Sequence, residues 1–319
     1  MRIGFDLGGT KMLAALLDDE RRIVARNKTK TTGVDNDGVF AQIQETIDEL
    51  LEEAGVTRTA LESVGIAAPG PIDMSSGTIL STPNLGLKDF ALSARLSDAL
   101  GCPVYLENDV NAGLWGEYVG GVARGKQHVI GIFPGTGIGG GIIVNGMLFR
   151  GKNGSAGEIG HITVQTDGRR CGCGNHGCLE TVASKTAIAR DLALLAMNGQ
   201  SPVLAEAGAT DIKLVKSGLI KKALDAGDFG VAAVVDQAAY FLGIGMAAMV
   251  NTFDPEMIVL GGGLVEKLGS RFTDIAERTM RERSMPRLVA EVAVVEAELG
   301  DDAAVVGAAD LADREHGGG

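Results

Sequence analysis

The pattern of apolar and polar positions predicts an alternation of strands and helices from the start of the chain. Short apolar runs separated by glycine turns come first, and residues 38–55 then carry apolar side chains at helical spacing. A strand is predicted over 63–73, a helix around 89–100 and a strand over 103–109. This alternation favours an α/β protein with a mostly parallel or mixed sheet.

The second half of the chain continues the alternation. The predicted elements are helices near 181–198, 211–226 and 230–252, strands over 256–264 and 289–299, and a last helix at about 302–316. The apolar stretch 238–250 is shorter than the roughly 20 residues that span a membrane, so a buried helix is expected. The first residues lack a secretory pattern, which favours a cytoplasmic protein without a membrane partner.

Two segments resemble each other in sequence. "IGFDLGGTKMLAALL" begins at Ile3 and "IGIFPGTGIGGGIIV" begins at Ile130, and each predicts a strand, a glycine turn with a threonine and a second strand. The shared positions, at one constant offset, are Ile3, Gly4 and Gly8 with Ile130, Gly131 and Gly135. We interpret the similarity as a duplicated fold with domains over 1–118 and 119–301, the last helix packing back on the first domain.

Composition and charge narrow the class of protein. The chain has 319 residues, of which 45% are hydrophobic and 47 are glycine, and aromatic residues make up 4%. Two domains with many tight turns fit these values. The net charge of −12 opposes a surface for a nucleic-acid backbone, so no nucleic-acid partner is expected. Backbone amides can still bind a small anion without lysines.

Two glycine motifs resemble nucleotide fingerprints but lack the required context. "GTGIGG" at 135–140 follows a strand but leads into a second strand, whereas a dinucleotide fingerprint opens a helix. "GGVARGK" at 120–126 is followed by Gln127, where a P-loop needs serine or threonine for magnesium. We therefore assign neither a dinucleotide-binding fingerprint to the first motif nor a P-loop to the second.

The glycine turns themselves are candidate phosphate sites, because successive turn amides form an anion-binding concavity. Each turn alone is also explained as a simple hairpin. The turn at Gly261-Gly262-Gly263 ends a strand and begins a helix, so it is a place for a flat nucleotide base to lie on the backbone. The three turns are Gly8-Gly9-Thr10, Gly135-Thr136-Gly137 and Gly261-Gly262-Gly263. Asp6 is a candidate for magnesium or its waters, and Lys11 either reaches a phosphate or faces solvent.

The stretch "CGCGNHGCLE" at 171–180 holds three of the four cysteines. Three thiolates at this spacing need one more ligand for tetrahedral zinc. His176 lies close by, but reaching the same ion from inside the short loop would strain it. Cys102 is expected to be a small core residue.

Several motifs together resemble the ROK group of sugar kinases and sugar-responsive regulators. They are "FDLGGTK" (5–11), "PGPID" (69–73), "ENDVNA" (107–112), "GTGIGGG" (135–141) and "GEIGH" with the cysteine stretch (157–180). The resemblance covers nearly the whole chain. It implies the actin/hexokinase-like (ribonuclease H-like) duplicated fold, with two domains around a central cleft, and binding of ATP, Mg²⁺ and a sugar.

The resemblance also implies roles for single residues. Its E-x-x-H spacing selects His161 as the fourth zinc ligand, with Cys171, Cys173 and Cys178. Four protein ligands leave no open position, so the zinc is expected to be structural and to hold a sugar-binding loop. The nucleotide turns at Gly8 and Gly135 lie on other segments, so loss of the zinc is expected to change nucleotide affinity much less than sugar affinity. The residues implied to bind sugar are Gly70, Asn84, Asn108, Asp109, Glu158, His161 and Glu180.

Asp109 is the implied general base, at the carboxyl end of a predicted strand, where open α/β sheets bind ligands. Asp109 could equally be the N-cap of the following helix. The function implied is ATP-dependent phosphorylation of a hexose, with glucose leading. The alternatives are kinases for N-acetylglucosamine, N-acetylmannosamine, mannose, fructose or allose, and a catalytically silent sugar-sensing regulator. A homodimer is expected from the resemblance.

Overall fold

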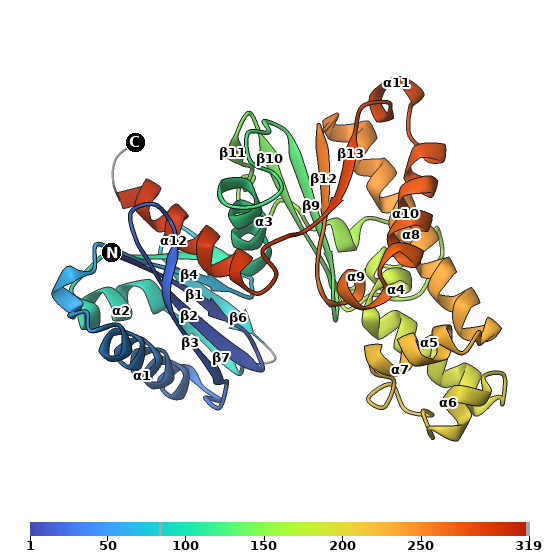
Figure 1. Cartoon of the computed structure of the whole chain (residues 1–319), viewed down its shortest axis with the longest axis horizontal. Helices are drawn as coiled ribbons and strands as arrows, with labels where there is room; N and C mark the ends of the chain where they lie inside the picture. The colour runs from blue at the N-terminus through green and yellow to red at the C-terminus, as the bar shows by residue number, and fades with distance from the viewer. Residues whose placement is uncertain (83–84, 317–319) are drawn as a thin grey trace. The chain divides into compact units, whose positions relative to one another are not determined.

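The computed structural model describes residues 1–82 and 85–316 and divides the chain into two compact units. Unit 1 holds Met1–Gly125, Leu148–Ala156 and the chain from Ala297 onward, and unit 2 holds Lys126–Met147 and Gly157–Glu296 (Figure 1). The units therefore change at 125/126 and 296/297, compared with the expected 118/119 and 301/302. Residues 148–156 belong to unit 1, although they lie within the stretch expected to form the second domain.

Unit 1 is built on a five-stranded sheet in the order β3-β2-β1-β4-β8. Its strands are β1 (Arg2–Leu7), β2 (Lys11–Leu17), β3 (Ile23–Lys30), β4 (Ser63–Ala68) and β8 (Val104–Asn108). β1 and β2 form the predicted antiparallel hairpin, and β4 and β8 run parallel to β1.

Unit 2 repeats this arrangement in the order β11-β10-β9-β12-β13. Its strands are β9 (Val129–Pro134), β10 (Ile138–Val144), β11 (Met147–Leu148), β12 (Met257–Leu260) and β13 (Ala293–Glu296). β9 pairs antiparallel with β10 and parallel with β12, as β1 pairs with β2 and β4. The common strand order confirms the duplication inferred from the repeat.

The helices of unit 1 cover both faces of its sheet. They are α1 (Asn36–Ala54), α2 (Leu92–Leu100), α3 (Asp109–Val119), α12 (Asp302–His316) and the short η1 (Arg58–Ala60). α1 begins at its N-cap Asp35, whose side chain accepts from Gly38 N–H, and ends at Gly55 with φ of 65°. Phe5 and Ile66 bury one face of the sheet in a core with Ile43 of α1.

The opposite face of this sheet admits α12 because glycine occupies a central position in β1 and in β4. A Cβ on Gly4 of β1 would overlap the carbonyl oxygen of Val305, and one on Gly65 of β4 would overlap that of Ala308. A Cβ on Gly307 of α12 would likewise overlap the carbonyl oxygen of Ala112 in α3. Glycine therefore lets the backbones of α12, the sheet and α3 approach one another directly.

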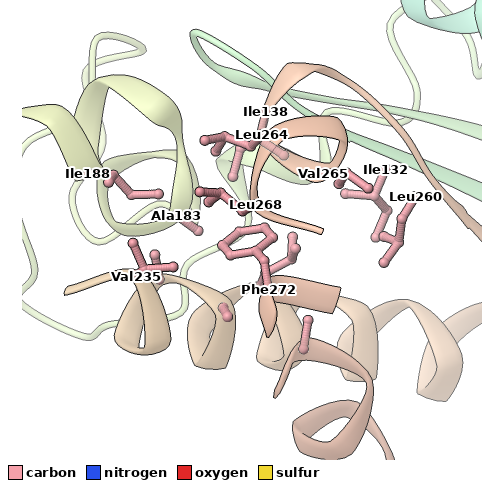
Figure 2. Close-up of a cluster of buried hydrophobic side chains, with 14 of the residues drawn as sticks. Ile132, Ile138, Ala183, Ile188, Val235, Leu260, Leu264, Val265, Leu268 and Phe272 are labelled. Carbon is pink, nitrogen blue, oxygen red and sulfur yellow. The ribbon is translucent and has the colours of Figure 1, made fainter. Parts of the chain in front are cut away.

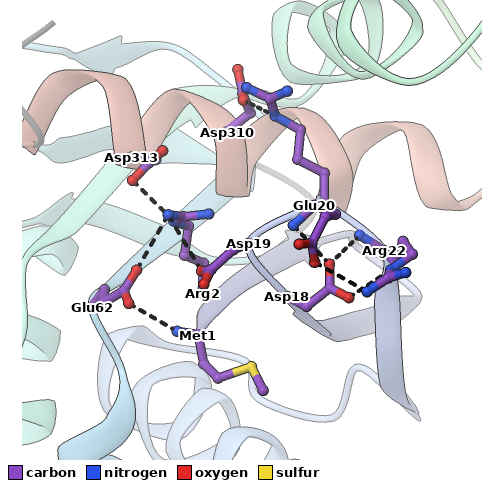
Figure 3. A network of polar contacts seen from close by, with 10 residues as sticks. Met1, Arg2, Asp18, Asp19, Glu20, Arg22, Glu62, Asp310 and Asp313 are labelled. Carbon is purple, nitrogen blue, oxygen red and sulfur yellow. Dashed lines mark hydrogen bonds and ion pairs between the residues drawn. The ribbon is translucent and has the colours of Figure 1, made fainter.

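A polar network ties the start of β1 to neighbouring segments of unit 1 (Figure 3). The Met1 amino group lies 3.2 Å from a Glu62 oxygen, and Arg2 pairs with Glu62 and with Asp313 of α12. Asp310 of α12 is buried and accepts from Trp115 Nε1 at 2.8 Å. These contacts hold the last helix on the first unit.

Helices make up most of unit 2 beyond its sheet. They are α4 (Glu180–Ala183), α5 (Lys185–Met197), α6 (Pro202–Glu206), α7 (Ser217–Asp225), α8 (Phe229–Phe253), α9 (Gly263–Leu268), α10 (Ser270–Arg283), α11 (Pro286–Val289) and η2 (Ile159–His161). Figure 2 shows Phe272 of α10 pointing into a buried cluster with Leu264 and Leu268 of α9. By length and composition α8 could cross a membrane, but residues such as Leu242 and Met246 bury it in this core.

Several boundaries differ from the predictions because local turn chemistry was missed. The predicted strand 63–73 ends at Ala68, and a small sheet of β5 (Ile72–Asp73), β6 (Thr78–Thr82) and β7 (Leu87–Phe90) follows. β7 also takes the start of the predicted helix 89–100. The predicted helix 181–198 divides at Ser184, which caps α5 by accepting from Ala187 N–H.

Candidate active site

In unit 1, the carboxyl end of β8 leads directly into α3 and places Asn108 and Asp109 there. Asn108 Oδ1 accepts from the N–H groups of Val110 (3.0 Å) and Asn111 (3.2 Å), so Asn108 is the N-cap of α3. The alternative that Asp109 is the cap is thus wrong. Asp109 is the first helical residue, and its Oδ1 accepts from Asn108 Nδ2 (3.1 Å) and from Val110 N–H (2.9 Å).

Gly70 lies beside this strand end, as its implied role in a sugar site requires. A Cβ built on Gly70 would lie 3.8 Å from Asn108 Nδ2, at ordinary contact distance. The Gly70–Pro71 peptide bond is cis. Asn84, the remaining sugar candidate of this unit, falls outside the described residues.

Asp6 at the end of β1 is the most perturbed carboxyl group near this point. Burial, and next the negative charge of Asp109, raise the pKa of Asp6 to about 7, although Lys11 opposes the shift. A carboxyl pair in this state favours a bound cation, because the cation stabilises both charged forms. Lys11 Nζ itself lies 2.6 Å from Asp301, and Lys28 pairs with the same carboxylate at 2.9 Å.

The first glycine turn joins β1 to β2. Gly8 N–H donates to the Lys11 carbonyl (3.0 Å), and the Thr31 hydroxyl donates to the Gly8 carbonyl (2.7 Å). Gly8 therefore shapes the turn with its own amide, while Gly9 and Thr10 at the tip are exposed.

The second glycine turn, between β9 and β10 of unit 2, has the same internal closure. Gly135 N–H donates to the Gly137 carbonyl at 2.8 Å. Outside the turn, Lys185 N–H donates to the Gly135 carbonyl (2.9 Å) and the Thr186 hydroxyl to the Thr136 carbonyl (2.7 Å). The start of α5 thus holds this turn in place.

Glu180 connects the same turn to the cysteine segment. Its Oε2 accepts from Ile138 N–H at 3.1 Å, and a Cβ on Gly137 would overlap that oxygen. Its Oε1 lies 3.8 Å from the Cys171 sulfur. The second turn lies on another segment of the chain, as expected, but Glu180 links it to the cysteine segment through hydrogen bonds that the sequence does not reveal.

The third glycine run lies beside the second turn. Gly261 N–H donates to the Ile132 carbonyl (3.1 Å), and Gly262, with φ of 85°, is the N-cap of α9. A Cβ on Gly262 would lie 2.9 Å from the Pro134 carbonyl oxygen. Only glycine fits both this backbone conformation and this spacing.

The segment "GEIGH" packs its backbone on β10. A Cβ on Gly157 would lie 2.7 Å from the Gly140 carbonyl oxygen, and one on Gly160 would overlap that of Ile138. This contact leaves the Glu158 side chain 65% exposed and His161 32% exposed, with His161 Nε2 3.8 Å from Glu158 Oε2. The Glu158 and His161 side chains thus lie on the side of the segment that faces away from β10.

His161 and three cysteines converge on one point of unit 2. One ligand atom from each of His161, Cys171, Cys173 and Cys178 lies within 4.8 Å of the others. The Cys173 and Cys178 sulfurs are 3.7 Å apart, and Cys171 Sγ is 3.5 Å from His161 Nδ1. Zn–S bonds of about 2.3 Å give a tetrahedral edge of about 3.8 Å, so the donor set fits zinc.

The thiols of this cluster have divergent acidities. Burial first, and then hydrogen bonds with Cys173 and Cys171, raise the pKa of the Cys178 thiol to about 12. A backbone hydrogen bond from Asn175 lowers the pKa of Cys173. A cation between the sulfurs would favour the thiolates throughout. His176, the alternative ligand, is an exposed loop residue.

Four charged residues were not singled out from the sequence: Glu107, Arg150 and Asp301, which support site residues, and Glu117 at the other end of α3. Glu107 and Glu117 are fully buried, and each interrupts an apolar run, "VYLEN" and "GLWGEY", which is a usable signal. Arg150 pairs with Glu107 at 2.7 Å, and Asp301 pairs with Lys11. These two partners are remote in sequence, so no local pattern marks them.

Together these features define a class: a duplicated α/β protein with a glycine turn after the first strand of each half, an aspartate at a strand end and a Cys₃His cluster. A model of the ROK family matches residues 2–315. The chain belongs to the ROK family.

Named relatives include both enzymes and regulators. A glucokinase of Halalkalibacterium halodurans is 36% identical over 312 residues, covering 96% of this chain and 92% of that protein. A xylose repressor of Bacillus subtilis is 30% identical, covering 86% of this chain and 68% of the repressor. The crystal structure of a ROK family glucokinase from Streptomyces griseus with glucose and AMPPNP superimposes with a TM-score of 0.83. It is 35% identical and covers 98% of this chain and 99% of that one.

Proposed function

We propose that this protein is an ATP-dependent hexose kinase that converts glucose to glucose 6-phosphate. The observation that carries the proposal is the end of β8, where Asn108 and Asp109 precede α3 and lie beside Gly70. The Streptomyces griseus relative that shares this fold binds glucose and AMPPNP, which supports both substrates.

Asp109 is the proposed general base. A hydroxyl that attacks a phosphoryl group must lose its proton, and a carboxylate at hydrogen-bonding distance accepts it. The bonds from Asn108 Nδ2 and Val110 N–H to Asp109 Oδ1 fix the side-chain orientation. Asn108, Asn84 and the backbone at Gly70 are proposed to bind the sugar hydroxyls in unit 1.

The glycine turns are proposed to bind the phosphates of ATP at their tips, where Gly9, Thr10 and Thr136 are exposed. The amides of Gly8 and Gly135 are used inside the turns, so the contacts are assigned to Gly9, Thr10, Thr136 and Gly137. The run Gly261–Gly263 is proposed to lie against the nucleotide base. To reach a phosphate, Lys11 would have to break its ion pair with Asp301. Lys11 is therefore a weaker candidate for phosphate binding than the glycine turns.

Asp6 is the proposed holder of magnesium or its waters. Its pKa of about 7 reflects burial and the neighbouring Asp109 charge, which a divalent cation would relieve. When bound, magnesium supplies positive charge that stabilises the transferring phosphoryl group.

In unit 2, Glu158, His161 and Glu180 are proposed to bind the sugar. Zinc held by His161, Cys171, Cys173 and Cys178 would be structural, because four protein ligands fill a tetrahedral site. His161 Nδ1 faces the sulfurs and Nε2 faces Glu158, so zinc binding would fix the nitrogen offered to a sugar hydroxyl.

A coupled ADP-release assay tests the function with a panel of hexoses and N-acetylhexosamines. We expect the highest kcat/KM with glucose. A higher value for N-acetylglucosamine, N-acetylmannosamine, mannose, fructose or allose would reassign the substrate and keep the kinase.

A sugar-responsive regulator is the second candidate, favoured by the xylose repressor relative. Sugar binding measured by calorimetry, together with no ADP release in the coupled assay, would support this second candidate. We further propose a cytoplasmic homodimer, which sedimentation velocity would test.

A further inference from the structure

A buried ion pair directly precedes the proposed catalytic strand end. Glu107 is 0% exposed, and its carboxylate accepts from Arg150 Nε at 2.7 Å and from the Tyr105 hydroxyl at 3.2 Å. It also accepts from Asn108 N–H (3.0 Å) and from Asn111 Nδ2 (3.1 Å). Four donors from three separate parts of unit 1 thus converge on one side chain.

Stability alone is a poor explanation for this arrangement. Removing two charges from water costs several kcal/mol for each ion, and apolar residues of similar volume often serve equally well. Burial, and next the charge of Glu107, raise the pKa of Tyr105 far above its usual value, so the phenol remains a donor. The Glu107 carboxylate is costly to bury and yet receives four donors, which is better explained by the geometry that it imposes.

We propose that the Glu107–Arg150 pair positions Asn108 and Asp109 for phosphoryl transfer, an inference that rests on the proposed kinase function. Glu107 binds the backbone of Asn108 and the side chain of Asn111, which are the two ends of the first turn of α3. Asn108 and Asp109 bind the N–H groups of that same turn. Glu107 therefore holds the turn on both sides of Asp109, and the donors that orient the Asp109 carboxylate belong to this same turn.

Arg150 extends this control to a second segment. It belongs to 148–156, the part of unit 1 that leads into Gly157 and Glu158 of unit 2. Ala156 N–H donates to the Arg150 carbonyl at 3.0 Å, which closes the segment into a loop. Loss of the Arg150 side chain should therefore disturb the chain that enters the proposed sugar loop as well as the strand end.

The test compares two buried glutamates of the same region. Glu117 is also 0% exposed, and its carboxylate accepts from the N–H groups of Val122, Glu298 and Leu299, at the far end of α3 from Asp109. Glu107→Gln and Glu117→Gln each keep volume and remove a charge, and both should lower thermal stability by a similar amount.

Their kinetics should differ. In Glu107→Gln we expect kcat to fall about tenfold or more, because small misplacements of reacting groups are costly, with nucleotide KM within about twofold of the parent. In Glu117→Gln we expect kcat within about twofold. Arg150→Lys should recover part of the kcat that Arg150→Met loses, since it restores the charge without the planar fork.

Amide hydrogen exchange at Val110 and Asn111 supplies a readout that needs no activity. Faster exchange in Glu107→Gln than in the parent and in Glu117→Gln supports the proposal. The proposal is overturned if kcat is unchanged in Glu107→Gln, if Glu117→Gln loses as much, or if exchange at these amides is unaltered. Failure of the unsubstituted protein to phosphorylate any hexose would instead overturn the function, and the exchange data would still decide whether Glu107 orders the strand end.

Discussion

The two glycine turns occupy equivalent places in the duplicated fold, yet different partners support them. The turn of unit 1 is closed by its own backbone and by Thr31 of the adjoining strand segment. The turn of unit 2 is held from outside by Glu180, Lys185 and Thr186, which follow the last cysteine of the Cys₃His cluster.

This difference indicates that duplication preserved strand order while the surrounding contacts diverged. In unit 1, α12 packs on the sheet, Glu107 bonds to the strand end, and Asp310 joins α12 to Trp115 of α3. In unit 2, the proposed metal cluster continues into the turn through Glu180. Disturbance of the cluster should therefore reach one turn and spare the other.

The largest expected effect is in unit 1, at Asp109. Asp109→Asn should lower kcat by about 10²-fold or more, the scale of losing a general base, while glucose affinity changes little. Steady-state kinetics and calorimetry with glucose measure both quantities. If the variant turns over glucose at nearly the parental rate, Asp109 is not the general base and is only a first-turn residue of α3.

The next effect concerns unit 2. Cys173→Ser should lose zinc and raise the KM for glucose strongly, since ring orientation at His161 and the place of Glu180 depend on the cluster. Nucleotide affinity should weaken by a smaller factor, because only the second turn contacts Glu180.

Elemental analysis and calorimetry on the parent, Cys173→Ser and Cys102→Ser measure this effect. Cys102 lies in the core of unit 1, so Cys102→Ser should keep its zinc. A parent that binds no zinc, or a zinc-free variant with parental glucose affinity, would contradict the prediction.

A smaller effect is expected at the close packing of α12. Gly307→Ala places a methyl group against the Ala112 carbonyl and should lower the free energy of unfolding by about 1–3 kcal/mol. Gly218→Ala in α7 is the matched control, because a Cβ there meets nothing within 4 Å. Chemical denaturation should show the control unchanged or slightly stabilised, and equal losses in both variants would refute close packing as the cause.

The smallest effect is expected at the exposed pair of Lys11 and Asp301. Asp301→Asn should change the free energy of unfolding by less than about 1 kcal/mol, as is usual for exposed ion pairs. Thermal denaturation measures it. If the same variant lowers the KM for ATP severalfold, the loss of the ion pair has freed Lys11 to bind phosphate. Lys11 would then count among the nucleotide-binding residues.

The sequence was informative wherever one segment carries its own signal. The repeat at Ile3 and Ile130 predicted two matching sheets, and the shared strand order confirms it. The absence of helix chemistry after Gly135 correctly excluded a dinucleotide fold, since residues 138–144 form β10.

Other features could not be predicted because they depend on residues far apart in the chain. The bonds of Glu107 with Arg150 and of Glu180 with Ile138 join segments about 40 residues apart, and no periodicity records such pairs. The sequence offered Asp109 as the possible N-cap, whereas Asn108 holds that position, and residue type does not separate them because both types favour it. The geometry at Val110 and Asn111 decided between them.

The most direct test of the central claim follows the phosphoryl group itself. Phosphorus NMR of the purified protein with ATP, Mg²⁺ and glucose should show ATP converted to ADP while a phosphomonoester signal grows, with glucose 6-phosphate as the product. This signal should require glucose and should be lost in Asp109→Asn. Unchanged ATP with every hexose, or release of inorganic phosphate alone, would contradict it.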